Sequence, residues 1–218
     1  MFSRVFIVYS CLFVLSGCVY DDEPMPKITH DYSSKVIQPR PLTPIKTPTK
    51  TQTNLDENIP RDWLPPSRVE RKWVAIVIHH SDTKNGSATI FDKFHRENKH
   101  WEGIGYDFVI GNGTDSGNGQ VEVTYRWRKQ ITGAHCGSTR GNWANKYAVG
   151  ICLVGRFNHT APTMQQMQSL VKLIRFLQNR YGIPKSRIYG HKATPGARAT
   201  DCPGKYFPMA RLKSILEF

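Results

Sequence analysis

The sequence predicts a mixed α/β domain over residues 71–218, in which helices flank a central β-sheet. Two continuous apolar runs rich in β-branched residues, 73–79 and 147–154, have the composition of strands covered on both faces. Segments with a helical period lie between and after them, and 163–180 is the clearest of these. Strands and helices that alternate in one stretch of this length are typical of a single α/β domain with one core.

Each element follows from local signals. The helix 163–180 repeats apolar residues at the 3.6-residue period, Thr163 can cap its start, and Gly182 and Pro184 can end it. The glycine-rich stretch 111–119 predicts a hairpin turn, because it lacks the ending of a phosphate loop and the acidic spacing of a calcium loop. In chain order we expect strand 73–79, helix 87–100, strand 104–110, strand 120–127, strand 147–154, helix 163–180, strand 187–189 and helix 208–216. For helix 87–100 the expected apolar side consists of Ile90, Phe91, Phe94 and Trp101.

The first residues have the layout of an export signal. Residues 5–15 form an apolar run after Arg4 that is too short to span a bilayer, which needs about 20 residues. The run ends in Leu15-Ser16-Gly17-Cys18, which resembles the lipobox of bacterial lipoproteins. This resemblance implies that residues 1–17 are a signal peptide and that Cys18 is lipid-modified and anchors the protein to a membrane. With valine rather than aspartate after Cys18, the sequence resembles lipoproteins that are sent on to the outer membrane, which implies the periplasmic face of that membrane in a cell with two membranes.

Residues 18–70 separate this anchor from the domain. Nine prolines are scattered through 19–68 among Thr, Lys and Asp, with no helical or strand period. Such a stretch cannot bury enough apolar surface to offset its ordering entropy, so we expect a flexible tether. About 50 residues would average ~40 Å as a coil and reach ~150 Å when extended. The alternative is a pro-segment that packs on the domain.

The positive charge of the chain lies in the domain. Residues 71–218 hold 22 Lys and Arg against 9 Asp and Glu, so the net charge of +13 belongs to this part. A basic domain favours an anionic partner, such as nucleic acid, an acidic membrane face or a carboxylate-rich cell-wall polymer. The export signal argues against nucleic acid. A solvated basic surface that only aids solubility is the alternative.

Three potential metal ligands follow predicted strands. His79 and His80 lie at the end of the first strand, His191 follows the strand 187–189, and Cys202 comes eleven positions later. Successive strand residues point to opposite faces, so only one of the first two can reach a given site. Imidazole and thiolate suit tetrahedral zinc, and three protein ligands leave one position for water. Such water can ionise near neutral pH and attack a carbonyl, which indicates metal-assisted hydrolysis.

The five cysteines have different expected fates. Cys11 would leave with the signal, Cys18 would carry the lipid, and Cys202 is the expected ligand. Cys136 and Cys152 could pair in an oxidising compartment. Cys152 lies in the apolar run 147–154, however, where a buried free thiol is an equal alternative.

Several motifs in order resemble one enzyme family. They are Ile78-His79-His80-Ser81, Gly105-Tyr106-Asp107-Phe108, Gly133-Ala134-His135, Val149-Gly150-Ile151, and Gly190-His191 with Thr200-Asp201-Cys202-Pro203-Gly204. Their combination resembles the zinc-dependent N-acetylmuramoyl-L-alanine amidases, in the branch of peptidoglycan-recognition proteins and phage lysozymes. The resemblance spans residues 73–207, nearly the whole domain.

The resemblance implies roles for five residues. His79, His191 and Cys202 match the zinc ligands, Tyr106 matches a tyrosine that contacts the reacting water or carbonyl, and Thr200 matches a residue that helps to polarise the carbonyl. Members that only bind peptidoglycan usually lack the cysteine ligand. Two departures stand out. The spacing between His191 and Cys202 is longer than in the recognition proteins, and the strand position that holds glutamate in some amidases is occupied by Cys152.

Three further residues are candidates for substrate binding. His135 has three interpretations: a donor to the substrate, a partner of a metal ligand, or a packed side chain. Arg126 and Arg128, beside Trp127, could contact stem-peptide carboxylates or belong to a solvated face. The resemblance implies peptidoglycan as the partner and Zn²⁺ as the cofactor. A non-catalytic peptidoglycan-binding protein is the alternative, and we expect a monomer in either case.

Overall fold

Five strands form the central sheet of the structure, a computed structural model that describes residues 59–216. The strands are β1 (Ala75–His80), β2 (Phe108–Ile110), β3 (Val121–Val123), β4 (Ala148–Leu153) and β5 (Ile188–Gly190), in the order β3-β2-β4-β1-β5. The β1 strand pairs in parallel with β4 and β5, β2 pairs in parallel with β4, and β3 is antiparallel to β2. The predicted mixed α/β class is therefore confirmed. The predicted signal peptide, Cys18 and most of the tether lie outside the described residues.

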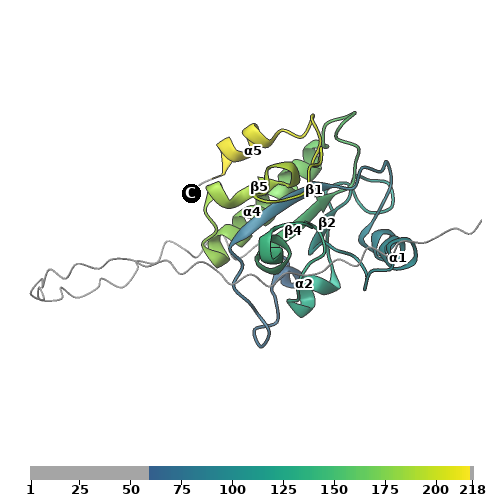
Figure 1. Ribbon diagram of the computed structural model, residues 1–218. Helices are drawn as coiled ribbons and strands as arrows, with labels where there is room; N and C mark the ends of the chain where they lie inside the picture. Colours follow the sequence, from purple (N-terminus) through teal and green to yellow (C-terminus); the bar gives the residue numbers. More distant parts are fainter. Residues whose placement is uncertain (1–58, 217–218) are drawn as a thin grey trace, which may run out of the picture. The chain divides into compact units, whose positions relative to one another are not determined.

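Five α-helices of the described part surround this sheet. They are α1 (Ala88–Lys99), α2 (Tyr125–Lys129), α3 (Trp143–Tyr147), α4 (Met164–Tyr181) and α5 (Met209–Ile215). Short 3₁₀ turns lie at Arg61–Trp63, Arg140–Asn142, Lys185–Arg187 and His191–Ala193. In Figure 1, α4 and α5 lie together on one side of the sheet, and α1 lies apart from them. Among residues 59–216, no helix has both the length and the apolar character needed to cross a bilayer.

The side chains of β1 divide between two faces. Ile76 and Ile78 join the main core, together with Leu170, Leu173, Ile174 and Leu177 of α4. Ala75 and Val77 pack on the opposite side with Ala148. Because of this alternation, His79 leaves the sheet on the side away from α4, and His80 turns toward Phe157, whose backbone N–H donates to His80 Nδ1 at 3.1 Å.

The α4 helix carries the clearest end signals. Thr163 Oγ1 accepts from the backbone N–H of Gln166, and the Gln166 side chain accepts from the backbone N–H of Thr163, which completes a capping box. Gly182 ends the helix in the left-handed conformation, with φ of 66°. The prediction for 163–180 is confirmed to within one residue at each end.

The strand predicted over 120–127 is wrong in its second half. The β3 strand stops at Val123, and Tyr125–Lys129 forms the α2 helix. Thr124 causes the change, because its hydroxyl caps the helix by accepting from the backbone N–H of Arg126 at 3.2 Å. The alternation that resembled a strand instead places Trp127 in the core and leaves Arg128 exposed.

The expected apolar side of α1 is only partly buried. Ser87 caps the helix as its sequence position suggests, and Phe91 is buried. Ile90 and Phe94 are both 45% exposed and Trp101 is 44% exposed, so this part of the prediction is wrong. The α1 helix packs on the domain through a narrower contact than its sequence indicates.

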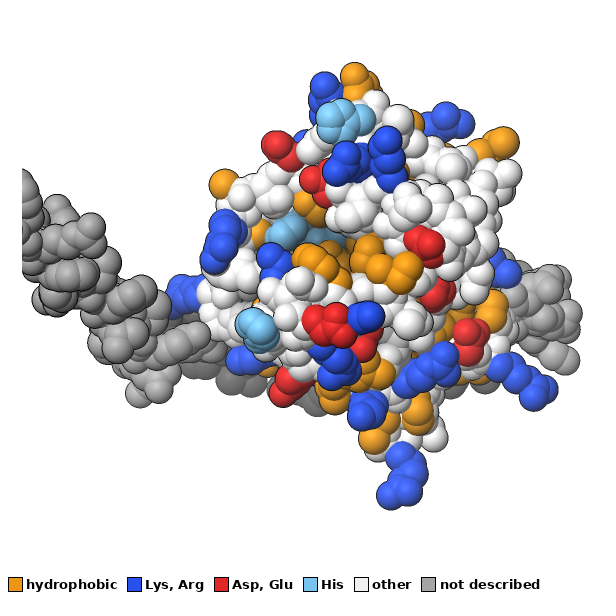
Figure 2. All heavy atoms as spheres, turned by 90° about the vertical axis from the view of Figure 1, so that its right-hand side faces the viewer, with side chains coloured by type: hydrophobic (Ala, Val, Ile, Leu, Met, Phe, Trp, Pro, Cys, Tyr) orange, Lys and Arg blue, Asp and Glu red, His pale blue; other side chains and the backbone are white. Residues whose placement is uncertain are grey.

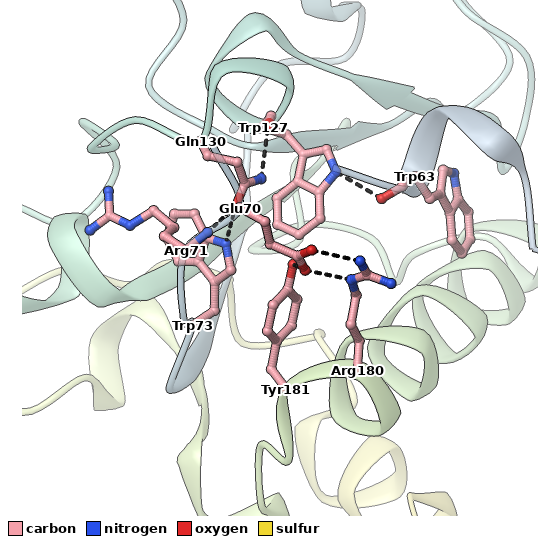
Figure 3. A network of polar contacts seen from close by, with 8 residues as sticks. All are labelled: Trp63, Glu70, Arg71, Trp73, Trp127, Gln130, Arg180 and Tyr181. Carbon is pink, nitrogen blue, oxygen red and sulfur yellow. Dashed lines mark hydrogen bonds and ion pairs between the residues drawn. The ribbon is translucent and has the colours of Figure 1, made fainter. Parts of the chain in front are cut away.

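A group of polar and aromatic side chains, called here the N-terminal clamp, holds residues 59–73 against the domain (Figure 3). Trp63 is buried in the main core and accepts from Trp127 Nε1 through its carbonyl at 2.9 Å. Glu70 pairs with Arg180 of α4 at 2.6 Å. The clamp comprises Trp63, Glu70, Arg71, Trp73, Trp127, Gln130, Arg180 and Tyr181.

Candidate metal centre

Three donor side chains from separate segments meet at one edge of the sheet. His79 ends β1, His191 follows β5 directly, and Cys202 lies in the loop before α5. Because Ile78 pairs with Gly190 in the parallel register of β1 and β5, both histidines leave the sheet at the same level. The ligand atoms of His79, His191 and Cys202 all lie within 4.8 Å of one another.

The loop that carries Cys202 is fixed by short-range hydrogen bonds. The thiol sulfur accepts from the backbone N–H of His80 at 3.4 Å, and the Cys202 carbonyl accepts from the backbone N–H of Lys192 at 2.8 Å. Gly190 makes room for this loop, because a Cβ there would lie 2.7 Å from Pro203 Cδ. The thiol is thereby held beside β1 before any ligand arrives.

The three donors fit a tetrahedral divalent cation. Cys202 Sγ lies 3.7 Å from His79 Nδ1. Zinc–nitrogen and zinc–sulfur bonds of about 2.0 and 2.3 Å in a tetrahedron imply an edge of about 3.5 Å. The His191 Nε2 atom is buried and has no hydrogen-bond partner within the described residues. A buried polar atom without a partner is unfavourable unless a ligand completes it.

The electrostatics of the centre favour a cation over protons. Burial lowers the pKa of His79 well below its usual value and also lowers the pKa of His191. Burial raises the pKa of the Cys202 thiol to about 12. The donors are therefore neutral in the absence of a metal, with both imidazoles deprotonated as metal ligation requires. The thiol would release its proton when a metal binds.

Tyr106 and Thr200 lie next to this cluster. The ring centroid of Tyr106 is 5.2 Å from that of His79, and burial raises the pKa of its hydroxyl well above the usual value. The hydroxyl therefore stays protonated and can donate a hydrogen bond. The Thr200 hydroxyl accepts from the backbone N–H of Cys202 at 3.2 Å. Tyr106, His191 and Thr200 are partly exposed, so solvent can reach the centre.

The face shown in Figure 2 is hollowed near its centre. Histidine and apolar side chains line this hollow, and basic side chains are scattered around it. A depression of this kind gives a substrate both apolar contact and attraction for negative charge.

The three residues predicted to bind substrate, His135, Arg126 and Arg128, do not share one environment. His135 is buried beside His79, and both of its ring nitrogens are hydrogen-bonded inside the protein. The Arg126 side chain is 5% exposed and donates to the carbonyl oxygens of Ile104 and Thr132. These contacts support the loops around the centre, whereas Arg128 is exposed on α2. Substrate binding by these three residues stays a prediction.

Two buried side chains near the metal centre are Cys152, whose pairing the sequence left open, and Asp107, which the sequence analysis did not single out. Cys152 pairs with His79 across β1 and β4, and both Cys152 and Cys136 are free thiols. Asp107 Oδ2 accepts from the backbone N–H of Gly150 at 2.8 Å, but Asp107 Oδ1 is buried without a partner. Burial raises the pKa of Asp107 to about 7. Its position after Tyr106 gave no signal that this carboxyl is buried.

Comparison with known proteins gives the class of this domain. The family model described as "N-acetylmuramoyl-L-alanine amidase" matches residues 70–205, and the chain belongs to this family.

Curated sequences and solved structures are also similar to about two thirds of this chain. Peptidoglycan-recognition protein SC1a of Drosophila melanogaster is 28% identical over 139 residues, which are 60% of this chain and 67% of that protein. The N-acetylmuramoyl-L-alanine amidase LysC from Clostridium intestinale has 31% identity and a TM-score of 0.54, over 67% of this chain and 93% of that chain. Wild-type Drosophila PGRP-LB has 25% identity and a TM-score of 0.53, over 68% and 84% of the two chains.

Proposed function

We propose that this protein is a zinc-dependent amidase that hydrolyses the bond between the lactyl group of N-acetylmuramic acid and L-alanine in peptidoglycan. The observation that carries the proposal is the convergence of His79, His191 and Cys202, with the unpartnered His191 Nε2 among them. Relatives named as amidases or peptidoglycan-recognition proteins support the choice of substrate class.

The roles of the residues follow from the chemistry of the reaction. Held by His79, His191 and Cys202, zinc would supply Lewis acidity that polarises a carbonyl and lowers the pKa of water. Tyr106 keeps its hydroxyl proton and can donate to the reacting water or to the oxygen on which negative charge develops. Thr200, next to Cys202, is the second candidate donor to that oxygen. The net positive charge of the domain attracts the carboxylates of stem peptides.

Digestion of purified sacculi tests this assignment. The full-length protein should release glycan strands and peptides with new free L-alanine amino termini, identified by mass spectrometry. Both a chelator and Cys202→Ala should abolish this release, whereas Cys136→Ala, which removes another buried thiol, should retain it. Release of reducing sugars instead of L-alanine termini would reject the bond assignment.

A non-catalytic peptidoglycan-binding protein is the second candidate. The basic charge and the recognition-protein relatives favour it. It predicts that the wild-type chain binds sacculi without turnover under any metal condition. The amidase proposal predicts instead that Tyr106→Phe and Thr200→Ala still bind sacculi but turn over more slowly than wild type.

We also propose that the protein is a monomer anchored through a lipid on Cys18 to the periplasmic face of the outer membrane. The lipobox-like residues 15–18 support the anchor. Labelled fatty acid should be incorporated into wild type and not into Cys18→Ala, and membrane fractionation should separate inner from outer membrane.

A further inference from the structure

A line of hydrogen bonds runs from the metal centre into the protein through His135. His79 Nε2 lies 3.1 Å from His135 Nδ1, and His135 Nε2 lies 3.2 Å from the carbonyl oxygen of Ala148. The other nitrogen of His79, Nδ1, is the one that faces Cys202 Sγ, at 3.7 Å. Each of the four ring nitrogens of His79 and His135 therefore faces a defined neighbour.

The contacts determine where the ring protons lie. A carbonyl oxygen can only accept, so His135 Nε2 must carry a hydrogen. Two ring nitrogens that face each other at 3.1 Å share one hydrogen, and a neutral His135 ring with its hydrogen on Nε2 offers Nδ1 as the acceptor. The hydrogen between the two rings then belongs to His79 Nε2. The lone pair of His79 Nδ1 is left free, directed toward the side where Cys202 lies.

The fold reserves a slot for the His135 ring. A Cβ at Gly150 would lie 2.5 Å from His135 Cδ2, and a Cβ at Gly133 would lie 2.7 Å from the same atom. Asn145 fixes the backbone of this segment, because its Oδ1 accepts from the backbone N–H of His135 and of Cys136, each at 2.8 Å. The ring position thus depends on residues from two separate segments of the chain.

We propose that His135 is a positioning residue that holds His79 in the tautomer with hydrogen on Nε2, and so presents Nδ1 to the cation. The inference rests on the proposed function and adds a residue that acts through a ligand and does not touch the substrate. Removing a hydrogen-bond partner of this kind typically weakens metal affinity by about 10–100-fold.

Zinc affinity of the full-length chain tests the role without any activity assay. Competition with a chromophoric chelator should show that His135→Phe weakens zinc binding by about 10–100-fold. His135→Asn keeps an acceptor oxygen near the position of Nδ1 and should recover most of the loss. A variant with the slot filled, Gly150→Ala, should also bind zinc more weakly. Gly137→Ala is the matched control, because a Cβ there meets nothing within 4 Å, and it should bind zinc like wild type.

Nitrogen-15 NMR of histidine side chains tests the tautomer in the unaltered chain, so the inference stays testable even if His135→Phe does not fold. His79 should be protonated at Nε2 both with and without zinc. Protonation at Nδ1 would overturn the inference, as would equal zinc affinity in wild type and folded His135→Phe. A wild-type chain that binds no zinc would overturn the proposed function as well. The failure of the inference alone is therefore distinguishable from the failure of the proposed function.

Discussion

The metal centre and the N-terminal clamp both combine buried and part-exposed polar side chains, but only the clamp leaves none of its buried polar atoms without a partner among residues 59–216. Glu70 accepts from Arg180 Nε at 2.6 Å and from the Tyr181 hydroxyl at 2.8 Å (Figure 3). No clamp residue is among the buried side chains of residues 59–216 that lack a partner, whereas His191 of the metal centre is.

This difference implies that the clamp contributes to the stability of the fold and that the metal centre contributes to metal binding and catalysis. A buried polar group without a partner costs about 1–3 kcal/mol, so the metal centre weakens the metal-free fold. The clamp closes its own hydrogen bonds and adds aromatic packing, so it stabilises the fold without any ligand. Substitutions in the centre should therefore change metal binding and turnover, and substitutions in the clamp should change unfolding.

The largest effect is expected for His191→Ala. Loss of one of three ligands should abolish tight zinc binding and reduce amide hydrolysis by at least ~10³-fold, about 4 kcal/mol. Metal-free urea unfolding should show little loss of stability, because the removed Nε2 has no hydrogen-bond partner among residues 59–216 and only the ring contact with His79 is lost. Zinc titration, sacculus digestion and urea unfolding measure the three quantities. His159→Ala, at an exposed histidine, should change none of them, and tight zinc binding by His191→Ala would break the contrast.

The opposite pattern is expected for Trp63→Ala in the clamp. Trp63 is 3% exposed and packs against Phe176 with ring centroids 5.8 Å apart. Its removal should lower the free energy of unfolding by about 3 kcal/mol and leave the zinc affinity of the folded protein unchanged. The neighbouring Leu64 is 47% exposed, so Leu64→Ala should cost less than about 0.5 kcal/mol. A Trp63→Ala protein with wild-type stability would show that the clamp is dispensable.

Asp107 should make the stability of the domain depend on pH. Burial raises its pKa from 3.8 to about 7, so its protonated form is favoured in the folded state. The contribution is fully present below pH 3.8 and is lost as the pH rises toward 7. Between pH 5 and 8, wild type should lose about 2–3 kcal/mol relative to Asp107→Asn in metal-free urea unfolding. Parallel pH profiles of the two proteins would show that Asp107 ionises normally in the fold.

The smallest effect concerns the ion pair of the clamp. A double-mutant cycle with Glu70→Gln and Arg180→Gln should give a coupling energy of about 0.5–1 kcal/mol at pH 7. The hydrogen bond from Arg180 lowers the pKa of Glu70, so this coupling is present above the ordinary carboxyl pKa. It should shrink as the pH falls through the lowered pKa. Zero coupling at pH 7 would leave the stability of the clamp to its aromatic residues.

The regular elements were predictable because their signals are local. The β-branched runs that became β1 and β4, and the capped α4 helix, carry period, cap and stop signals within a few residues. The α2 helix could not be predicted, because its alternating residues have the period of a strand. Only the cap at Thr124 favours a helix there. The predicted burial of the apolar side of α1 was also wrong, because the exposure of Phe94 depends on how the helix packs against the rest of the domain.

The candidate ligands could be predicted because residue type and strand alternation limit the choices. Alternation alone placed only one of His79 and His80 at the site, and the structure directs His80 to the N–H of Phe157. The contact between His79 and His135 could not be foreseen, because the two residues are 56 positions apart and meet only in the folded sheet. The same holds for the slot at Gly150, which no local pattern reveals.

Zinc X-ray absorption spectroscopy of the full-length, metal-loaded protein tests the metal centre most directly. Two imidazole nitrogens at about 2.0 Å and one sulfur at about 2.3 Å are expected, from His79, His191 and Cys202, with the sulfur lost in Cys202→Ala. A spectrum without a sulfur neighbour, or one unchanged in that variant, would contradict the assignment of these three ligands.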